Sequence, residues 1–114
     1  MKKGAFLMIL SCAFAHVASQ AAIPMLHEEA FARQEEKLII ASPIAGIHNR
    51  LWFDYRIDVT EAQKELASDL RHASDIEDRR DAWEEYGVEL RKERIDYIEA
   101  MAKRGYRQGT VTVG

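Results

Sequence analysis

The sequence predicts a mainly α protein, either a small helical bundle or a helical hairpin with an additional N-terminal helix, after a cleavable signal peptide. Three observations predict it. Apolar side chains recur at helical spacing along the second half of the chain, 31% of the 114 residues are charged, and there are only two prolines and six glycines. The expected units are a signal peptide (1–21), an N-terminal helix and connector (22–43), a helical domain (44–104) and a flexible C-terminal tail (105–114).

Residues 1–21 have the three regions of an export signal. Two lysines at positions 2 and 3 precede a stretch, 4–18, that contains no Asp, Glu, Lys or Arg, and Ser19-x-Ala21 has the small-x-small pattern of a cleavage site. Two alternatives stay open: the segment is retained as an N-terminal anchor, or residues 9–12 form a lipobox and Cys12 is lipidated. The expected location is periplasmic or secreted, with membrane contact only through this segment if it is uncleaved.

Cleavage would leave an acidic chain without cysteine. It removes two of the sixteen Lys and Arg and none of the nineteen Asp and Glu, which takes the net charge from −3 to −5. This balance gives no bulk positive field, so no nucleic-acid partner is expected. A small chain without a disulfide must be stabilised by helix packing, a metal or a partner.

The first expected helix of the mature chain spans residues 28–41. Glu28 and Glu29 lie in its first turn, where carboxylates interact favourably with the positive end of the helix dipole. Ser42-Pro43 is expected to end it, because proline disfavours helical geometry in the preceding residue. Residues 44–46 are interpreted as a connector.

Residues 51–59 fit two interpretations. Apolar residues alternate with polar ones, which is the period of a half-buried strand. A single strand, however, has no pairing partner except the tail at 110–113. The helical alternative, starting near Asn49, is therefore favoured.

The clearest prediction is a helical hairpin over residues 60–104. Thr60-x-x-Gln63 has the pattern of a capping box, in which the two side chains would satisfy amides at the start of a helix. Ser74-x-x-Glu77 is a second such pattern, which marks either a break or a site within one long helix. Gly87 is a weak helical position, and Lys103-Arg104-Gly105 is a typical stop signal.

Trp52, Phe53 and Tyr55 are the candidate partner-binding residues. Aromatic side chains close to arginines are typical of protein-binding hot spots, and Arg50 and Arg56 flank this cluster. The alternative is that the aromatics fill the core, which a domain of this size needs. Both interpretations stay open, and the core interpretation is favoured.

His72 is the candidate metal ligand, together with Asp69 and Asp75, which lie three residues to either side of it. Imidazole and carboxylate groups can bind a divalent metal, but a site needs three or four converging ligands. The alternative is a histidine on a solvated helix face. No cofactor is expected.

No enzymatic activity is expected. The sequence contains no HExxH or GxSxG motif and no glycine-rich phosphate loop. Its adjacent carboxylate pairs, such as Glu84-Glu85, point about 100 degrees apart on a helix and do not face each other.

Two short segments resemble known exported proteins. Residues 59–63, Val-Thr-Glu-Ala-Gln, resemble the LTxxQ motif of small helical stress chaperones and metal-response proteins of Gram-negative bacteria, with valine in place of leucine. That resemblance implies a helical hairpin, often dimerised into a cupped surface, that holds unfolded clients or senses metals, with structural roles for Thr60 and Gln63. Ala82-Trp83-x-x-Tyr86 is similar to small helical lysozyme-inhibitor-like proteins, whose cysteines are absent here. Neither resemblance identifies a family.

The sequence therefore predicts an exported, non-catalytic helical protein that binds a protein partner or self-associates, with a chaperone-like role as one form of this. The alternative hypothesis is a periplasmic metal-binding or metal-responsive protein that uses His72 with nearby carboxylates.

Overall fold

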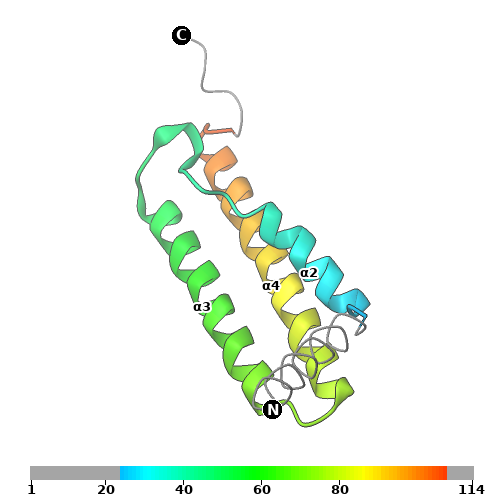
Figure 1. Cartoon of the computed structure of the whole chain (residues 1–114). Helices are drawn as coiled ribbons and strands as arrows, with labels where there is room; N and C mark the ends of the chain where they lie inside the picture. Colours follow the sequence, from blue (N-terminus) through cyan, green and yellow to red (C-terminus); the bar gives the residue numbers. More distant parts are fainter. Residues whose placement is uncertain (1–23, 108–114) are drawn as a thin grey trace, which may run out of the picture.

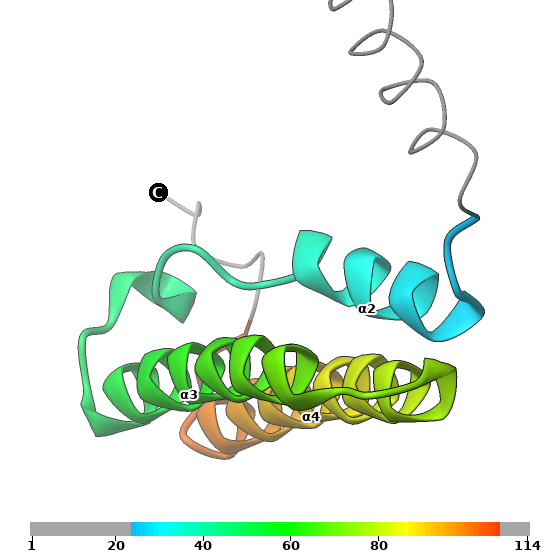
Figure 2. The same ribbon diagram turned by 60° about the horizontal axis from the view of Figure 1, so that its bottom comes forward.

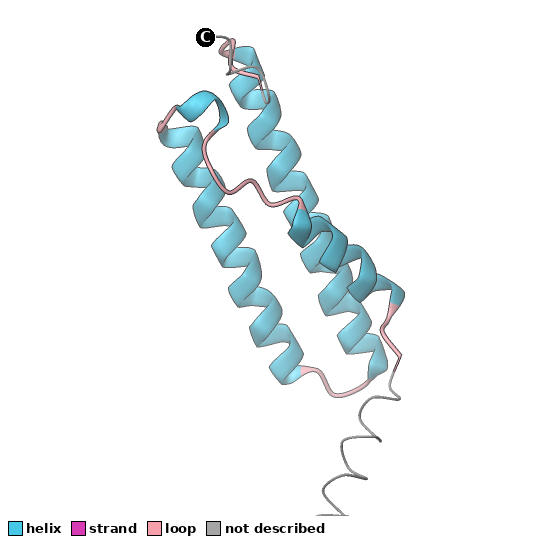
Figure 3. Ribbon diagram, turned by 45° about the horizontal axis from the view of Figure 1, so that its top comes forward, coloured by secondary structure: helices cyan, strands magenta, loops and turns pink. Residues whose placement is uncertain are grey.

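The computed structural model describes residues 24–107, which form three α-helices and one short 3-10 helix (Figures 1 and 3). The elements are α2 (His27–Lys37), η1 (Ile44–Gly46), α3 (Arg50–His72) and α4 (Ile76–Lys103). The described residues contain no strand, so the predicted mainly α class is confirmed. The predicted signal peptide (1–21) and residues 108–114 of the predicted tail lie outside the described residues.

Helix α4 is the centre of the arrangement. It forms an antiparallel hairpin with α3, and α2 packs along a second side of it (Figures 1 and 2). Among the described helices, α4 makes the extensive contact with α3, and no other helix covers the side of α3 that faces away from α4. Within residues 24–107, no helix combines the length and the apolar composition needed to cross a membrane.

Residues 51–59 are helical and belong to α3, so the strand alternative is wrong and the helix prediction is confirmed. Trp52, Tyr55 and Val59 are buried at steps of three and four residues, which places them on one helix face. Asn49 caps the helix, since its side-chain oxygen accepts a hydrogen bond from the backbone N–H of Trp52 at 3.1 Å. The segment is therefore helical, with one face buried, although its apolar and polar residues alternate as in a strand.

The predicted capping box at Thr60 is wrong. Thr60 lies inside α3, where its hydroxyl donates to the backbone oxygen of Arg56 at 2.9 Å. The hairpin accordingly begins ten residues earlier, at Arg50. The helix break at the second predicted cap, near Ser74, does occur, but the capping residue is Asp75. Its carboxylate accepts a hydrogen bond from the backbone N–H of Asp78 at 2.8 Å. Ser74 donates to the Asp78 carboxylate at 3.0 Å instead.

Helix α2 ends at Lys37, four residues before the predicted end at 41. The cause is long-range. The N–H of Ile40 donates to the Tyr55 hydroxyl at 2.9 Å, and the N–H of Ile44 donates to the Tyr97 hydroxyl at 3.0 Å. The amide of Ile40, within the predicted last turn, is therefore satisfied by the core of the hairpin rather than by another turn of helix, and the amide of Ile44 anchors the connector to the same core.

Helix α4 ends where the sequence predicts. Gly105 has a φ of +90°, which glycine adopts without steric penalty. Its N–H donates to the carbonyl of Ala102 at 2.9 Å, and the N–H of Tyr106 donates to that of Met101 at 3.0 Å. This pair of hydrogen bonds is a Schellman motif, and Tyr106 packs against the core beside it.

The core is mainly aromatic. Tyr55 and Tyr97 stack with ring centroids 4.9 Å apart, and Trp52 lies 5.8 Å from Tyr97. Such rings supply most of the buried apolar area of a small domain. Together with them, the buried core contains Ala32, Ile44, Val59, Ala62, Trp83, Tyr86, Leu90 and Met101.

Candidate functional site

The structure separates the three aromatic residues that the sequence singled out. Trp52 and Tyr55 are 2% and 3% exposed and fill the core, whereas Phe53 is 51% exposed. Consecutive helical residues point about 100 degrees apart, so they cannot all face the same way. The favoured core interpretation is therefore confirmed for Trp52 and Tyr55, and their assignment as partner-binding residues is wrong. Phe53 is the member of the cluster that a partner can reach.

Phe53 belongs to a larger surface that we call the outer face of α3. Ile57, one turn further along the helix, is 54% exposed, and the two side chains are neighbours at i and i+4. The outer face encloses a shallow depression of about 510 Å³, lined by Phe53, Arg56, Ile57, Thr60, Glu61 and Lys64. Two large, half-exposed apolar side chains thus lie side by side on a face of α3 that no other described helix covers, with the centre of the His48 ring 6.3 Å from that of the Phe53 ring.

The charged residues of this face lack ionic partners. Among the described residues, neither Arg56 nor Lys64 nor Glu61 forms an ion pair. The Arg56 guanidinium instead lies 5.6 Å from the centre of the Trp52 ring. Arg56 and Lys64 thus lie beside two exposed apolar side chains without an acidic partner among the described residues.

A second depression continues from the outer face. It has a volume of about 280 Å³ and lies between α3 and the connector that follows α2. Arg56 and Thr60 line both depressions, so the two form one continuous surface. The other residues that line the second depression are Ile39, Ile40, Ala41, Tyr55, Val59 and Gln63.

Sequence reasoning missed Ile57 and Lys64 as site residues and gave Arg56 only as a neighbour of the aromatic cluster. The signal was present, because Phe53 and Ile57 are four residues apart and share a face once the segment is helical. While a strand remained an alternative, these residues could not be assigned to one surface. Whether Phe53 and Ile57 share one surface depends on the secondary structure of residues 51–59 and not on the residue types.

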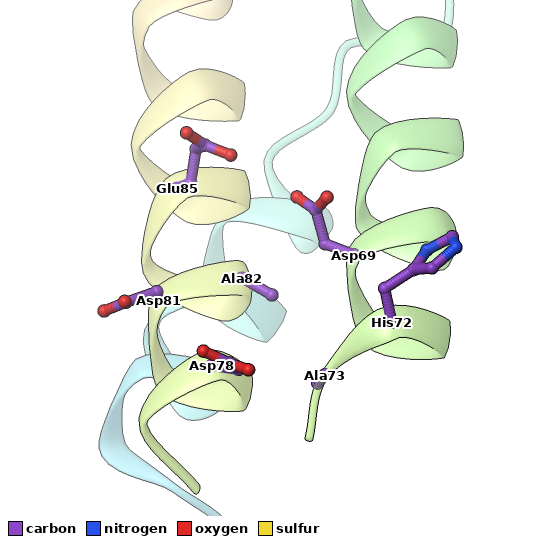
Figure 4. A pocket seen from close by; sticks show the side chains of 7 residues that line it. All are labelled: Asp69, His72, Ala73, Asp78, Asp81, Ala82 and Glu85. Carbon is purple, nitrogen blue, oxygen red and sulfur yellow. The ribbon is translucent and has the colours of Figure 1, made fainter. Parts of the chain in front are cut away.

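The predicted metal ligands do not converge. The Nδ1 atom of His72 lies 2.8 Å from the backbone oxygen of Ser68, and its ring points away from Asp69 (Figure 4). Asp75 is engaged as the cap of α4. In the part of the chain that the structure describes, no group of three or more His, Cys, Asp and Glu residues could hold a metal ion. The geometry therefore gives no ligand set that includes His72.

Carboxylates of α3 and α4 instead face each other along one side of the hairpin, which we call the acidic seam. Two shallow pockets lie along it, and Figure 4 shows Asp69 and Glu85 on opposite sides of one of them. The main cations near it are Lys92, 2.9 Å from Asp96, and Arg50, 3.8 Å from Asp54. The acidic seam comprises Asp54, Asp58, Glu65, Asp69, Asp78, Glu85, Glu89, Glu93 and Asp96.

Glu93 is the most strongly perturbed carboxyl group of the acidic seam. Burial, together with hydrogen bonds to the carboxyl groups of Glu89 and Asp58, raises its pKa to about 7. Burial and the nearby charges of Glu65 and Asp69 also raise the pKa of Glu85. Between about pH 4.5 and pH 7, the folded chain therefore retains a proton on Glu93 that the unfolded chain releases.

We expect the protein to lose stability as the pH rises from about 4.5 to about 7. The pKa of Glu93 is higher in the folded state, so the folded state binds the proton more tightly over this interval, and its advantage disappears above it. Because the side chain is 15% exposed, solvent screens part of the interaction, and the expected loss of stability over this interval is about 1–2 kcal/mol. Glu93→Gln should remove most of this loss when the free energy of unfolding is measured by urea denaturation across the interval.

The control for this experiment is Glu99→Gln, an exposed carboxylate on the same helix outside the acidic seam. It should leave the pH profile unchanged. A wild-type stability that rises between pH 4.5 and 7, or a profile that Glu93→Gln does not flatten, would contradict the expectation.

Comparison with known proteins gives no further guide to the site. No protein-family model matches the sequence, no curated protein is detectably similar to it, and no solved structure matches its fold.

Proposed function

We propose that this chain is an exported protein, periplasmic or secreted, that has no catalytic activity and acts by binding a protein through the outer face of α3. The observation that carries the proposal is the pair of half-exposed side chains Phe53 and Ile57 on a face of α3 that no other described helix covers. Apolar residues clustered at one point on the surface, with arginine beside them, are typical of binding hot spots. The composition of residues 1–21 supports export.

The unpaired charges support the same proposal. Arg56, Glu61 and Lys64 surround the apolar pair without ion pairs within residues 24–107. Charges at the rim of an interface contribute mainly to the specificity and rate of association. The alternative of metal binding through His72 has less support, since the imidazole points away from Asp69.

Site-specific photo-crosslinking in cells tests the proposal. A photoreactive phenylalanine analogue replaces Phe53 in one variant and Val88 in the other. Val88 is a matched control, because it is 54% exposed on α4 and lies away from the outer face. We expect covalent adducts from position 53 in the exported fraction and few from position 88. Equal adduct yields at the two positions, or none at position 53, would refute the proposed binding surface.

A further inference from the structure

The outer face of α3 has the residue spacing of a two-stranded coiled-coil seam. Its central residues follow one another at steps of four, three and four, which is the a and d pattern of a heptad repeat. All four side chains are exposed and line one depression. These seam residues are Phe53 and Thr60 at d positions, and Ile57 and Lys64 at a positions.

The residues beside this seam carry opposite charges on its two sides. Arg56 occupies a g position on one side, and Glu61 occupies an e position on the other. In a parallel pair of helices, a g residue faces the e residue five positions later on the other helix. Arg56 of one copy would therefore face Glu61 of the other copy, and the reverse contact would follow by symmetry.

The opposite orientation lacks this complementarity. In an antiparallel pair, like positions face each other, so Asp54 and Glu61, both at e positions, would lie opposite the same acids of the second copy. Acids that oppose each other at a contact lower its stability. The charges of the outer face thus favour a parallel arrangement.

We propose that the outer face of α3 binds a second copy of this chain, with the two α3 helices parallel and in register. Phe53 and Ile57 pack against their own counterparts, and two symmetric pairs form between Arg56 and Glu61. This inference rests on the proposed function and names the partner. The second copy supplies the ionic partners that Arg56 and Glu61 lack within the described chain.

The expected dimer is weak and reversible. It has two apolar layers, and a lysine at an a position fixes the register and the number of strands while lowering the stability of the pair. The contact covers about three helical turns, which places it among the small interfaces of transient complexes. We therefore expect dissociation in the micromolar range rather than a permanent dimer.

Sedimentation equilibrium of the processed protein, from about 1 to about 200 µM, tests the association. We expect the average mass to rise toward twice that of one chain. Arg56→Glu and Glu61→Arg should each weaken association about tenfold, because each replaces two attractive pairs by two repulsive ones. The double variant, which exchanges the charges, should restore association to within about threefold of the wild type.

Chemical crosslinking tests the orientation. Thr60→Cys and Ala67→Cys are made separately in chains without Cys12 and treated with a short bismaleimide. Parallel helices in register bring both positions close to their counterparts, whereas an antiparallel pair centred on the depression separates the two copies of position 67. We expect crosslinked dimers from both variants. Glu99→Cys, exposed on α4, should give none.

The outcomes separate this inference from the proposed function. A monomer at all concentrations overturns the dimer, and so does a double charge variant that stays as weak as the single variants. Crosslinks from position 60 but not from position 67 overturn the parallel orientation. A monomer whose position 53 still gives adducts of another mass leaves the proposed function standing. A monomer without adducts overturns both. Circular dichroism spectra of the variants establish that each has folded.

Discussion

Replacing Arg94 by methionine is expected to lower the free energy of unfolding by about 3 kcal/mol. The Nη2 atom of Arg94, on α4, lies 2.7 Å from Oε1 of Glu35, on α2. Glu35 is only 7% exposed and is the one buried charged residue of the described chain. Methionine retains much of the volume of arginine but leaves this carboxylate buried without its partner. Chemical denaturation at neutral pH measures the loss.

Two further variants isolate the ion pair. Arg91→Met removes an exposed arginine from the same helix and should change stability by less than about 0.5 kcal/mol. Glu35→Leu combined with Arg94→Met removes both charges and should return stability to within about 1 kcal/mol of the wild type, because no buried charge is left unpaired. If Arg94→Met behaves like Arg91→Met, the ion pair does not contribute to the attachment of α2.

The same pair illustrates what the sequence could not predict. Glu35 and Arg94 are separated by 59 residues, and the hydrogen bond of 2.6 Å from Tyr86 to Glu36 spans 50. No local pattern marks either contact, since each residue alone has the composition of an ordinary helix surface. The attachment of α2 to α4 depends on these pairs and on Arg33, whose guanidinium lies 4.6 Å from the centre of the Trp83 ring.

Features set by neighbouring residues were predictable. The start of α3 at Asn49 and the end of α4 before Gly105 follow from a side-chain cap and from a residue with positive φ, and both are local. The Thr60 pattern failed for an equally local reason. A threonine followed by a glutamine three residues later caps a helix only where no earlier turn exists, and α3 already supplies the backbone oxygen of Arg56.

The candidate site was only partly predictable. The sequence drew attention to Phe53, which is exposed, but grouped it with Trp52 and Tyr55, which are not. It could not connect Phe53 with Ile57 while residues 51–59 fitted both a strand and a helix. For His72, the nearby acids suggested a ligand set, but the spacing of residues along a helix does not fix where a ring points. The acidic seam could not be predicted, because its carboxylates come together only when α3 pairs with α4.

Gly87 provides the second large expected effect. The sequence marks it as a weak position within a helix, yet its absent side chain is what lets α2 approach α4. A Cβ atom at this position would lie 2.7 Å and 2.8 Å from two ring carbons of Phe31 and 3.2 Å from the Cα of Ala32. The ring could turn away, but the backbone of α2 would have to move. Gly87 is therefore a contact position rather than a flexible one.

Gly87→Val is expected to lower the free energy of unfolding by about 3 kcal/mol, because overpacking of a buried contact is costly and valine adds two further methyl groups. Since the three nearest atoms all belong to α2, amide hydrogen exchange should accelerate in α2 more than in the α3–α4 hairpin. Glu84→Val, at an exposed position of α4, measures the effect of valine on helix stability without the clash.

A companion pair separates the two parts of that contact. Gly87→Ala alone combines a gain of about 1 kcal/mol in helix propensity with a larger packing penalty, so it should be destabilising. In a Phe31→Ala background the two closest atoms are absent, and the Cα of Ala32 remains at 3.2 Å. There it should become neutral or stabilising. If Gly87→Ala stabilises the wild-type chain as much as it stabilises the Phe31→Ala chain, then Phe31 does not limit the approach of the two helices.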